Sequence, residues 1–473
     1  MKNSITFILN DQEVSTPLPS GTVTLDFIRR HRGLTGTKES CREGECGSCT
    51  VLLGELKEGR VQYKAVASCL LPMGELCGKH VVTIEGLNSD RLNPIQQALV
   101  DHGAIQCGFC TPGIVVSLTG FFLSEEQIDY DNAIDAIDGN ICRCTGYASI
   151  RRAVASLCDA FSREKRKGGD RLRQLVEWLL IPGYFLRIPG RLRRLESLVS
   201  PVKKRKGKII AAGETDLFVQ KPEELIDKEI EFISRHKELT HIKEEKNTIT
   251  IGAAVTVEEL RNSPVMIRHF PDIKCYFGLI ASHLIRNRAT AAGNIVNASP
   301  IGDLTIFLLP LKSTVVLSSG SQNREISLRH FFKGYKKLDM RPGEMIRAVR
   351  FPLPQKGTLF NFEKVSRRKH LDIAGCNSAI SLRVEKSKIS EIHLSAGGVA
   401  PVPFYLEKTC HFLTGRAITA ADIREAARIM QGEISPISDV RGTADYKRLL
   451  LRQLFFAHFL KFFPEKIKIQ ELM

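Results

Sequence analysis

The spacing of four cysteines near the N-terminus constrains this chain more than any other feature of its sequence. Three of them share one loop, with four and then two residues between neighbours, and the fourth follows after nineteen more. This is the plant-type spacing of four thiolates on a [2Fe-2S] cluster. Gly44 and Gly47 lie in the same loop, and glycine readily supplies the positive φ values and inward-facing N–H groups that such a loop needs. The predicted iron ligands are Cys41, Cys46, Cys49 and Cys69.

A structural zinc site is the main alternative, because zinc knuckles also use cysteine pairs two residues apart. A loop of three cysteines with a distant fourth fits a zinc knuckle poorly. The sequence therefore favours an iron–sulfur cluster at this loop.

A second set of four cysteines follows in a region of helical pattern. A Cys-x-x-Cys pair and a Cys-x-Cys pair have 31 residues between them. Zinc is again the alternative, but two one-electron carriers so close in sequence would form a relay, which favours a second [2Fe-2S] cluster. The predicted ligands are Cys107, Cys110, Cys142 and Cys144. We expect the remaining cysteines to be ordinary buried thiols; these are Cys77, Cys158, Cys275, Cys376 and Cys410.

The composition places the chain among multidomain globular proteins. A length of 473 residues is too great for one core and suggests three or four domains. The thirteen cysteines come without a secretory signal pattern, which favours metal ligands in a reducing cytoplasm. No apolar run reaches the roughly 18 residues of a transmembrane helix. We therefore expect a cytoplasmic protein that does not span a membrane.

The net charge of +16 raises the question of nucleic-acid binding. The basic residues are clumped in runs at 163–167, 187–194 and 203–208, without interleaved aromatics or a nucleic-acid-binding motif. A solvated linker, or a surface that docks an acidic partner, is the better interpretation. We expect no nucleic acid as a partner.

The first third of the chain predicts two small domains and a linker. Residues 1–86 show alternating strand patterns at 5–9 and 81–85 and one helix from 24, for which Thr24 is a plausible N-cap. Residues 87–162 predict four helices, at 94–102, 114–123, 130–138 and 150–161. Residues 163–206 are basic and broken by glycine and proline, as expected of an inter-domain linker that partly docks on its neighbours, with one short helix around 172–180.

The remainder predicts two further parts, 207–355 and 356–473. Two small-residue turns, at 210–217 and 290–294, would let backbone N–H groups approach an anion closely. A plain tight turn is the alternative interpretation of each. Neither matches Gly-x-Gly-x-x-Gly, so an ordinary Rossmann site is not supported. The last part predicts strands at 360–365, 379–384 and 391–396 and helices at 420–431 and 445–462, with the phenylalanines near 455–463 as core packing.

With these motifs, the chain resembles the iron–sulfur and flavin subunit of the xanthine dehydrogenase branch of the molybdenum hydroxylase family. The most specific parts are the first cysteine loop, residues 106–113 and residues 142–147. The resemblance implies an α+β multidomain fold: a β-grasp [2Fe-2S] ferredoxin domain, a four-helix [2Fe-2S] domain and a two-part FAD-binding domain. It also implies that the two turns hold the FAD pyrophosphate, through Ile210, Ala211, Ala212, Gly213, Glu214, Thr215, Asp216, Leu217, Thr290, Ala291, Ala292, Gly293 and Asn294. Further implied flavin contacts are Asp303, Ile346 and Lys364.

The resemblance implies a function as well. Electrons would come from a molybdopterin-binding partner subunit, because this sequence has no molybdenum domain, and would pass through both clusters to FAD and on to NAD. Arg368 and Asp372 resemble the mobile loop on the NAD side of the flavin. Gln106 either contacts the partner's pterin or caps a helix. The chain departs from the family at Ile280, where relatives often have an aromatic.

The substrate is left open by these motifs. Subunits of dehydrogenases for aldehydes, nicotinate or other N-heterocycles share every motif, since substrate choice belongs to the partner. A non-catalytic iron–sulfur redox sensor would keep both clusters, and a zinc-dependent nucleic-acid binder would explain the positive charge. We assign no catalytic residue from the sequence, and we expect a hetero-oligomer.

Overall fold

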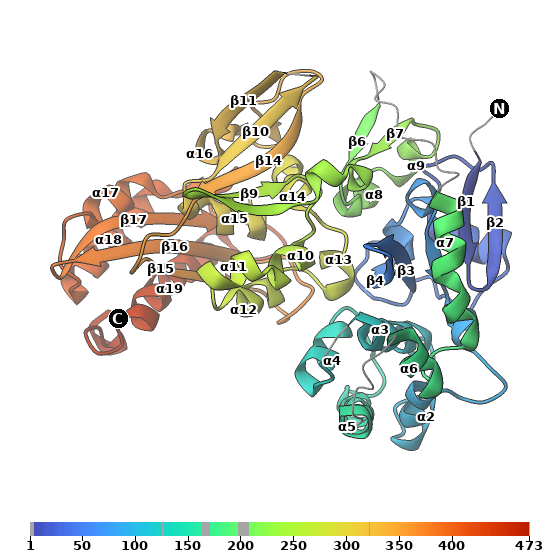
Figure 1. Ribbon diagram of the computed structural model, residues 1–473. Coiled ribbons are helices and arrows are strands. Elements are labelled where there is room, and N and C mark those ends of the chain that lie inside the picture. Colours follow the sequence, from blue (N-terminus) through green and yellow to red (C-terminus); the bar gives the residue numbers. More distant parts are fainter. Residues whose placement is uncertain (1–3, 125–126, 163–170, 197–207, 321, 473) are drawn as a thin grey trace. The chain divides into compact units, whose positions relative to one another are not determined.

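The computed structural model describes residues 4–124, 127–162, 171–196, 208–320 and 322–472. The chain divides into two compact units. Figure 1 shows the chain coloured by residue number from the N-terminus to the C-terminus. The first comprises Met1–Phe232 and Ser282–Arg288, and the second comprises Ile233–Ala281 and Ala289–Met473.

The first unit is built on a five-stranded sheet with strand order β2-β1-β5-β3-β4. The predicted strand at 5–9 forms an antiparallel hairpin with the strand that follows it, and the chain turns at Asn10, whose φ is +54°. The predicted strand at 81–85 is shorter and ends at Val82, because a 3-10 turn follows. The strands are β1 (Ile5–Leu9), β2 (Gln12–Thr16), β3 (Thr50–Lys57), β4 (Arg60–Ala67) and β5 (His80–Val82).

The prediction that Thr24 caps the first helix is wrong. Thr24 is the first residue of α1 (Thr24–Asp26), and Val23 occupies the capping position with an extended backbone. A cap must have that extended conformation for its side chain to reach the first free N–H groups. The Thr24 hydroxyl is instead buried without a hydrogen-bond partner among the described residues. The helix continues as a π-helical turn over Phe27–His31.

Four helices follow, as the sequence predicts. Asn93 and Gln96 form a capping box that starts the first of them. The second of them, α3, is apolar and packs on the sheet. Gly120 lets α3 lie close to β3, because a Cβ at this position would be 2.9 Å from the Leu52 side chain. The helices are α2 (Pro94–Asp101), α3 (Thr111–Ser124), α4 (Tyr130–Ala136) and α5 (Ala148–Ser162).

The region expected to be a linker is more ordered than predicted where the structure describes it. It contains α6 (Arg171–Glu177), a 3-10 turn (Gly183–Arg187) and α7 (Ile188–Glu196). Figure 1 shows α7 running alongside the N-terminal sheet, against which its buried apolar residues pack. The basic run at 163–167, and 203–207 of the third run, lie outside the described residues.

The basic run at 187–194 is partly neutralised within the chain. Arg187 and Arg191 lie 2.6 and 2.8 Å from the carboxylate of Asp11, and Arg194 pairs with Glu13. These contacts hold α7 to the β1–β2 hairpin. An acidic partner for this run is therefore found in the same polypeptide.

The first unit is completed by a short parallel strand pair and short helices. The strand and turn predicted at 210–217 are β6 and the start of α8. A segment from later in the sequence, with α13, joins this unit. The elements are β6 (Ile209–Ala211), α8 (Thr215–Gln220), α9 (Pro222–Leu225), β7 (Ile230–Phe232) and α13 (His283–Arg286).

The second unit begins with a five-stranded sheet of order β11-β10-β14-β9-β8, whose pairs are all antiparallel. Short helices accompany it. The strands are β8 (Ile242–Glu245), β9 (Thr248–Gly252), β10 (Thr314–Ser319), β11 (Gln322–Ser327) and β14 (Met345–Pro352), with a small pair β12 (Phe332–Gly334) and β13 (Lys337–Leu338). The helices are α10 (Val257–Asn262), α11 (Pro264–His269), α12 (Ile273–Gly278), α14 (Ala291–Asn297), α15 (Asp303–Leu308) and α16 (Leu328–Phe331).

The last part is the predicted antiparallel sheet closed by helices. Phe455, Phe456 and Phe459 are buried in its core, as expected. The strands are β15 (Leu359–Val365), β16 (Cys376–Glu385), β17 (Lys388–Gly397) and β18 (Phe404–Tyr405), and the helices are α17 (Glu407–Leu413), α18 (Ala420–Glu433), α19 (Ala444–Phe462) and α20 (Ile469–Leu472). Among the described residues, no helix combines the length and apolar character needed to cross a bilayer.

Candidate iron–sulfur and flavin sites

The structure brings the four cysteines of the first set together as two pairs. The pKa of the Cys46 thiol is lowered and that of Cys41 is raised, because a hydrogen bond between the two favours one thiolate and one thiol. The same relation lowers the pKa of Cys49 and raises that of Cys69. Cys49 and Cys69 are buried, whereas Cys41 and Cys46 are half-buried.

The two glycines of this loop have the backbone that the sequence predicts. Gly44 has a φ of +74° and Gly47 a φ of +66°. The Glu43 N–H donates to the Cys41 sulfur at 3.4 Å, so part of the backbone faces the thiols. A Cβ on Gly47 would lie 2.4 Å from the Gly139 carbonyl oxygen. Glycine is therefore required at position 47 for two reasons: its φ is positive, and a side chain would collide with the Gly139 carbonyl.

The second set of cysteines also forms two pairs. The sulfurs of Cys107 and Cys144 are 3.5 Å apart, and both residues are exposed. Burial, together with a hydrogen bond to Cys142, raises the pKa of Cys110 to about 12. Burial opposes ionisation of Cys142, but hydrogen bonds led by that of the Thr145 side chain lower its pKa.

The paired arrangement fits two irons better than one zinc. A tetrahedral zinc site gathers its thiolates around one ion, whereas four thiolates divide between the two irons of a [2Fe-2S] cluster. Within the part of the chain that the structure describes, no three His, Cys, Asp or Glu side chains converge on a single metal position.

The two cysteine loops touch each other. The Ile141 N–H donates to the Cys46 carbonyl oxygen at 3.0 Å, and the Asn140 side-chain amide donates to the Gly47 carbonyl oxygen at 3.0 Å. Asn140 is buried, and its own carbonyl accepts from the Ser117 hydroxyl at 2.8 Å. Sequence reasoning assigned Asn140 no role, although its place just before Cys142 in the motif was a usable signal.

The first predicted flavin turn, 210–217, lies in the first unit. Glu214 has a φ of +61° at the start of α8 and is buried. Its carboxylate pairs with Arg288, which also lies 2.8 Å from Glu75. One Glu214 oxygen and the Arg288 Nε are buried without a partner among the described residues, which leaves an acceptor and a donor for a bound group.

The second predicted flavin turn, 290–294, is the beginning of α14 in the second unit. Thr290 caps this helix, since its hydroxyl accepts from the Gly293 N–H at 3.1 Å. The Asn294 side chain accepts from the Thr305 N–H at 3.1 Å and from its hydroxyl at 2.9 Å. These bonds fix the small-residue turn against α15.

Two of the further predicted flavin residues, Asp303 and Lys364, meet in a largely buried ion pair. The Lys364 ammonium, on a side chain only 1% exposed, donates at 2.7 Å to Asp303 Oδ2, to the Leu279 carbonyl and to the Asp372 carbonyl. Asp303 also accepts from the Asn377 amide at 2.5 Å. The third residue, Ile346, is buried within β14 instead and shares none of these contacts.

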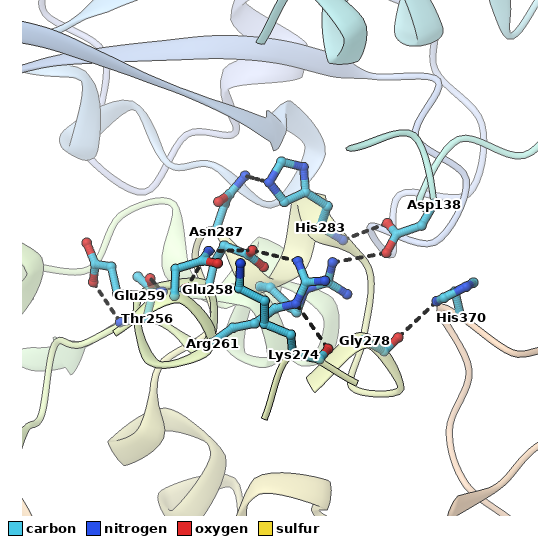
Figure 2. Close-up of polar contacts among 12 residues, drawn as sticks. Asp138, Thr256, Glu258, Glu259, Arg261, Lys274, Gly278, His283, Asn287 and His370 are labelled. Atoms are coloured by element: carbon cyan, nitrogen blue, oxygen red, sulfur yellow. Dashed lines mark hydrogen bonds and ion pairs between the residues drawn. The ribbon is translucent and has the colours of Figure 1, made fainter. Parts of the chain in front are cut away.

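The loop that contains Arg368 and Asp372 is held by several bonds. The Arg368 N–H donates to the Asp372 carboxylate at 3.0 Å, and its guanidinium donates to the Leu371 carbonyl at 3.0 Å. Figure 2 shows His370 reaching Gly278, where Nδ1 donates to the carbonyl oxygen at 2.9 Å. Sequence reasoning did not single out His370.

The aromatic residues nearest Ile280 lie in the core. Phe277 is fully buried and its ring centroid is 5.1 Å from that of Phe307. The Tyr276 hydroxyl donates to the Phe360 carbonyl at 3.0 Å. Both aromatic side chains are thus engaged in packing, and Ile280 itself is buried.

Exposure and position correct two smaller predictions, the one for Gln106 as a helix cap and the one for the five cysteines outside the two sets. Gln106 is exposed and lies five residues before α3, so it does not cap that helix. Cys158, Cys376 and Cys410 are buried as expected, but Cys275 is exposed and Cys77 is half-buried, so the prediction of buried thiols is wrong for these two.

Four family models match successive parts of the chain. A 2Fe-2S iron–sulfur cluster binding domain matches residues 7–73, and a [2Fe-2S] binding domain matches residues 83–155. The FAD binding domain in molybdopterin dehydrogenase matches residues 191–354. The CO dehydrogenase flavoprotein C-terminal domain matches residues 361–462.

Curated relatives match nearly the whole chain. The xanthine dehydrogenase/oxidase of Gallus gallus is 27% identical over 97% of this chain and 40% of its own length. The xanthine dehydrogenase of Blastobotrys adeninivorans is 28% identical over 96% of this chain, and aldehyde oxidase 2 of Mus musculus is 26% identical over 100% of it, each over 40% of its own length. The chain thus spans about 40% of the length of these relatives.

Among solved structures, the carbon monoxide dehydrogenase from Hydrogenophaga pseudoflava that lacks the Mo-pyranopterin moiety of its cofactor is similar with a TM-score of 0.50 and 27% identity. The similarity covers 53% of this chain and 88% of that chain. The reconstituted CO dehydrogenase from Oligotropha carboxidovorans gives the same TM-score at 25% identity, over 53% of this chain and 87% of that one. With two cysteine loops in contact, the chain carries two [2Fe-2S] domains, an FAD binding domain and a CO dehydrogenase flavoprotein C-terminal domain, and it is similar along its length to molybdenum hydroxylases.

Proposed function

We propose that this chain is the electron-transfer subunit of a xanthine dehydrogenase-type molybdenum hydroxylase. Electrons would enter from a molybdopterin-binding partner subunit at the second cysteine set, pass to the first set and reach FAD, with NAD as the final acceptor. The observation that supports this most is the 3.0 Å hydrogen bond from the Ile141 N–H to the Cys46 carbonyl, because it joins the two cysteine loops directly. When bound, the iron–sulfur clusters supply one-electron transfer and the flavin exchanges electrons singly or in pairs.

Differences in exposure support this order of the two sets. Cys107 and Cys144 are exposed, and so are the apolar side chains of Phe109 and Ile141 beside them, at 44% and 38%. Exposed apolar groups that cluster at one place are typical of an interaction surface. A partner subunit would cover the second set there, and the exposed Gln106 would hydrogen-bond its pterin.

Several residues fit the proposed flavin site. The turn at 290–294 offers small side chains fixed by Thr290, and Asp303 and Lys364 form a buried ion pair. By its bonds to Leu279 and Asp372, Lys364 would also hold the 366–375 loop in place for NAD to approach. The turn at 210–217 would supply a further contact to the FAD pyrophosphate.

In this proposal, the partner subunit determines which substrate is oxidised. Relatives of the chain include both xanthine dehydrogenases and aldehyde oxidases. Xanthine is our first proposal because the relatives with the highest identity among those described above carry that name.

The metal and flavin content of anaerobically purified protein tests the proposal. Two [2Fe-2S] clusters require four irons and four acid-labile sulfides per chain, together with one FAD. Cys41→Ser should remove half of the iron and Cys107→Ser the other half, while Cys158→Ser, a buried cysteine outside both sets, should leave the iron content unchanged. Stoichiometric zinc without sulfide would reject the electron relay.

Co-purification tests the partner and substrate. We expect a molybdenum-containing chain to accompany this one, and xanthine to bleach the flavin absorbance of the complex. NADH should reduce the flavin of the isolated chain. Bleaching by an aldehyde or nicotinate but not by xanthine would replace the proposed substrate, and failure of NADH to reduce the flavin would reject NAD as the acceptor.

A further inference from the structure

A short segment from the flavin part of the sequence is built into the iron–sulfur unit. Ser282–Arg288 groups with the N-terminal 232 residues and not with its own sequence neighbours. It contains the single helical turn α13, which contacts β4 and α4. None of the sequence motifs described above assigns this segment a role.

One side of the segment contacts the loop of the second cysteine set. The His283 N–H donates to one Asp138 oxygen at 2.7 Å, as Figure 2 shows. The Arg286 guanidinium lies 3.1 Å from the other oxygen, and the two side chains are 0% and 2% exposed. Just beyond, a Cβ on Gly139 would lie 2.9 Å from Ser282 and 3.2 Å from Leu284. The segment therefore lies directly against the backbone that leads to Cys142.

The other side contacts the loop of the first set. A Cβ on Gly44 would lie 2.6 Å from the Ile285 Cδ1 atom. Ile285 packs in the same apolar cluster as Cys49 and Cys69. The Asn287 amide donates to the Ala65 carbonyl in β4 at 2.9 Å. Adjacent residues, Leu284 and Ile285, thus contact the two different cysteine loops.

The chemistry of these contacts fixes the segment in place. A fully buried Arg–Asp pair is costly to break, because removing one partner leaves an uncompensated charge in a medium of low dielectric constant. Asp138 is engaged on both oxygens by this segment. A single helical turn has little freedom to stretch, so the distance between its two contact sides is set by covalent geometry.

We propose that Ser282–Arg288 is a positioning element that sets the spacing between the two cysteine loops, with Arg286 and Ile285 as its positioning residues. The inference rests on the proposed function, because the spacing matters only if each loop carries a [2Fe-2S] cluster. Arg286 anchors the element to the second loop, and Ile285 fits it to the first.

Paramagnetic resonance of the fully reduced, loaded protein tests this inference. Two reduced clusters interact magnetically, and the resulting splitting of their signals depends on their separation and relative orientation. We expect Arg286→Met and Ile285→Ala each to change this splitting, and Arg286→Lys, which keeps a cation, to restore the wild-type pattern. Lys447→Met is the matched control, because it removes a cation of similar burial, 3% exposed and 2.6 Å from Asp439, in the second unit.

The outcomes separate this inference from the proposed function. Wild-type protein that lacks two cluster signals would overturn the function itself. If the wild type carries both clusters and the splitting is unchanged in Ile285→Ala and in Arg286→Met, only the positioning role is rejected. Should Arg286→Met fail to fold, Ile285→Ala decides alone, since it leaves no buried charge unpaired.

Discussion

Two buried histidines, one in each unit, are held neutral. His80 Nε2 donates to the Asn10 carbonyl at 2.9 Å, so Nδ1 is the atom that accepts from the Tyr63 hydroxyl at 2.8 Å. His458 lies between the Asn361 amide and the Ser378 hydroxyl, at 2.8 and 3.1 Å. Burial lowers the pKa of each to about 3. A proton on Nδ1 of His458 would face the Asn361 amide donor, and a proton on Nδ1 of His80 would require the Tyr63 hydroxyl to turn from donor to acceptor.

These histidines predict a loss of stability in mild acid. The unfolded chain binds a proton at each histidine near pH 6.5, whereas the folded protein does not until about pH 3. Between these values the unfolded state holds more protons, so the free energy of unfolding falls as pH falls, by about 1.4 kcal/mol per pH unit for each histidine. Urea denaturation at pH 7, 6 and 5 measures the slope.

A substitution at one site separates the two contributions. His80→Gln should flatten the pH dependence of the first unit, while His458→Gln, in the second unit, should leave it unchanged. An equal slope in wild type and His80→Gln would contradict the assignment of the proton uptake to this ring.

At the scale of elements, α7 shows what a local pattern can hide. Ile188, Leu192 and Leu195 recur at helical spacing and all three are buried. The signal is present in the sequence, but the surrounding arginines and the Pro-Gly pair favour a solvated linker. The buried face becomes recognisable only with its partner, because Ile8 and the acidic groups of the N-terminal hairpin lie far away in sequence.

The packing of α7 predicts a measurable contribution to stability. Leu192→Ala removes a fully buried side chain and should lower the free energy of unfolding of the first unit by about 2–5 kcal/mol, since it loses apolar burial and leaves a cavity. Leu186→Ala, at a side chain that is 42% exposed, is the control and should cost much less. Equal effects of the two substitutions, measured by urea denaturation, would mean that α7 is not docked as described.

At the scale of the whole molecule, the sequence predicts chemistry better than contacts. Cysteine spacing is a local pattern, so both candidate iron–sulfur sites can be proposed without knowledge of the fold, and family models for two [2Fe-2S] domains match the same regions. The contacts between these sites are not predictable in this way, because Asn140 and Gly47 lie 93 positions apart and Arg286 and Asp138 lie 148 apart. No repeat or spacing in a single sequence encodes such pairs.

The division into two compact units predicts two unfolding transitions. Each unit has its own buried core, and domains with separate cores commonly unfold as separate cooperative blocks. Calorimetry should resolve two peaks, of which Leu192→Ala lowers the midpoint of only one. A single peak that shifts as a whole in this variant would show that the units unfold together.

The placement of Ser282–Arg288 limits how this polypeptide can be divided. A fragment cut after the fourth helix of the iron–sulfur half would leave the Asp138 carboxylate without its cation and uncover the surfaces that Leu284 and Ile285 occupy. If the chain were divided between its iron–sulfur and flavin parts, this stretch would have to be supplied in trans. It would become an obligatory subunit interface in place of an internal turn.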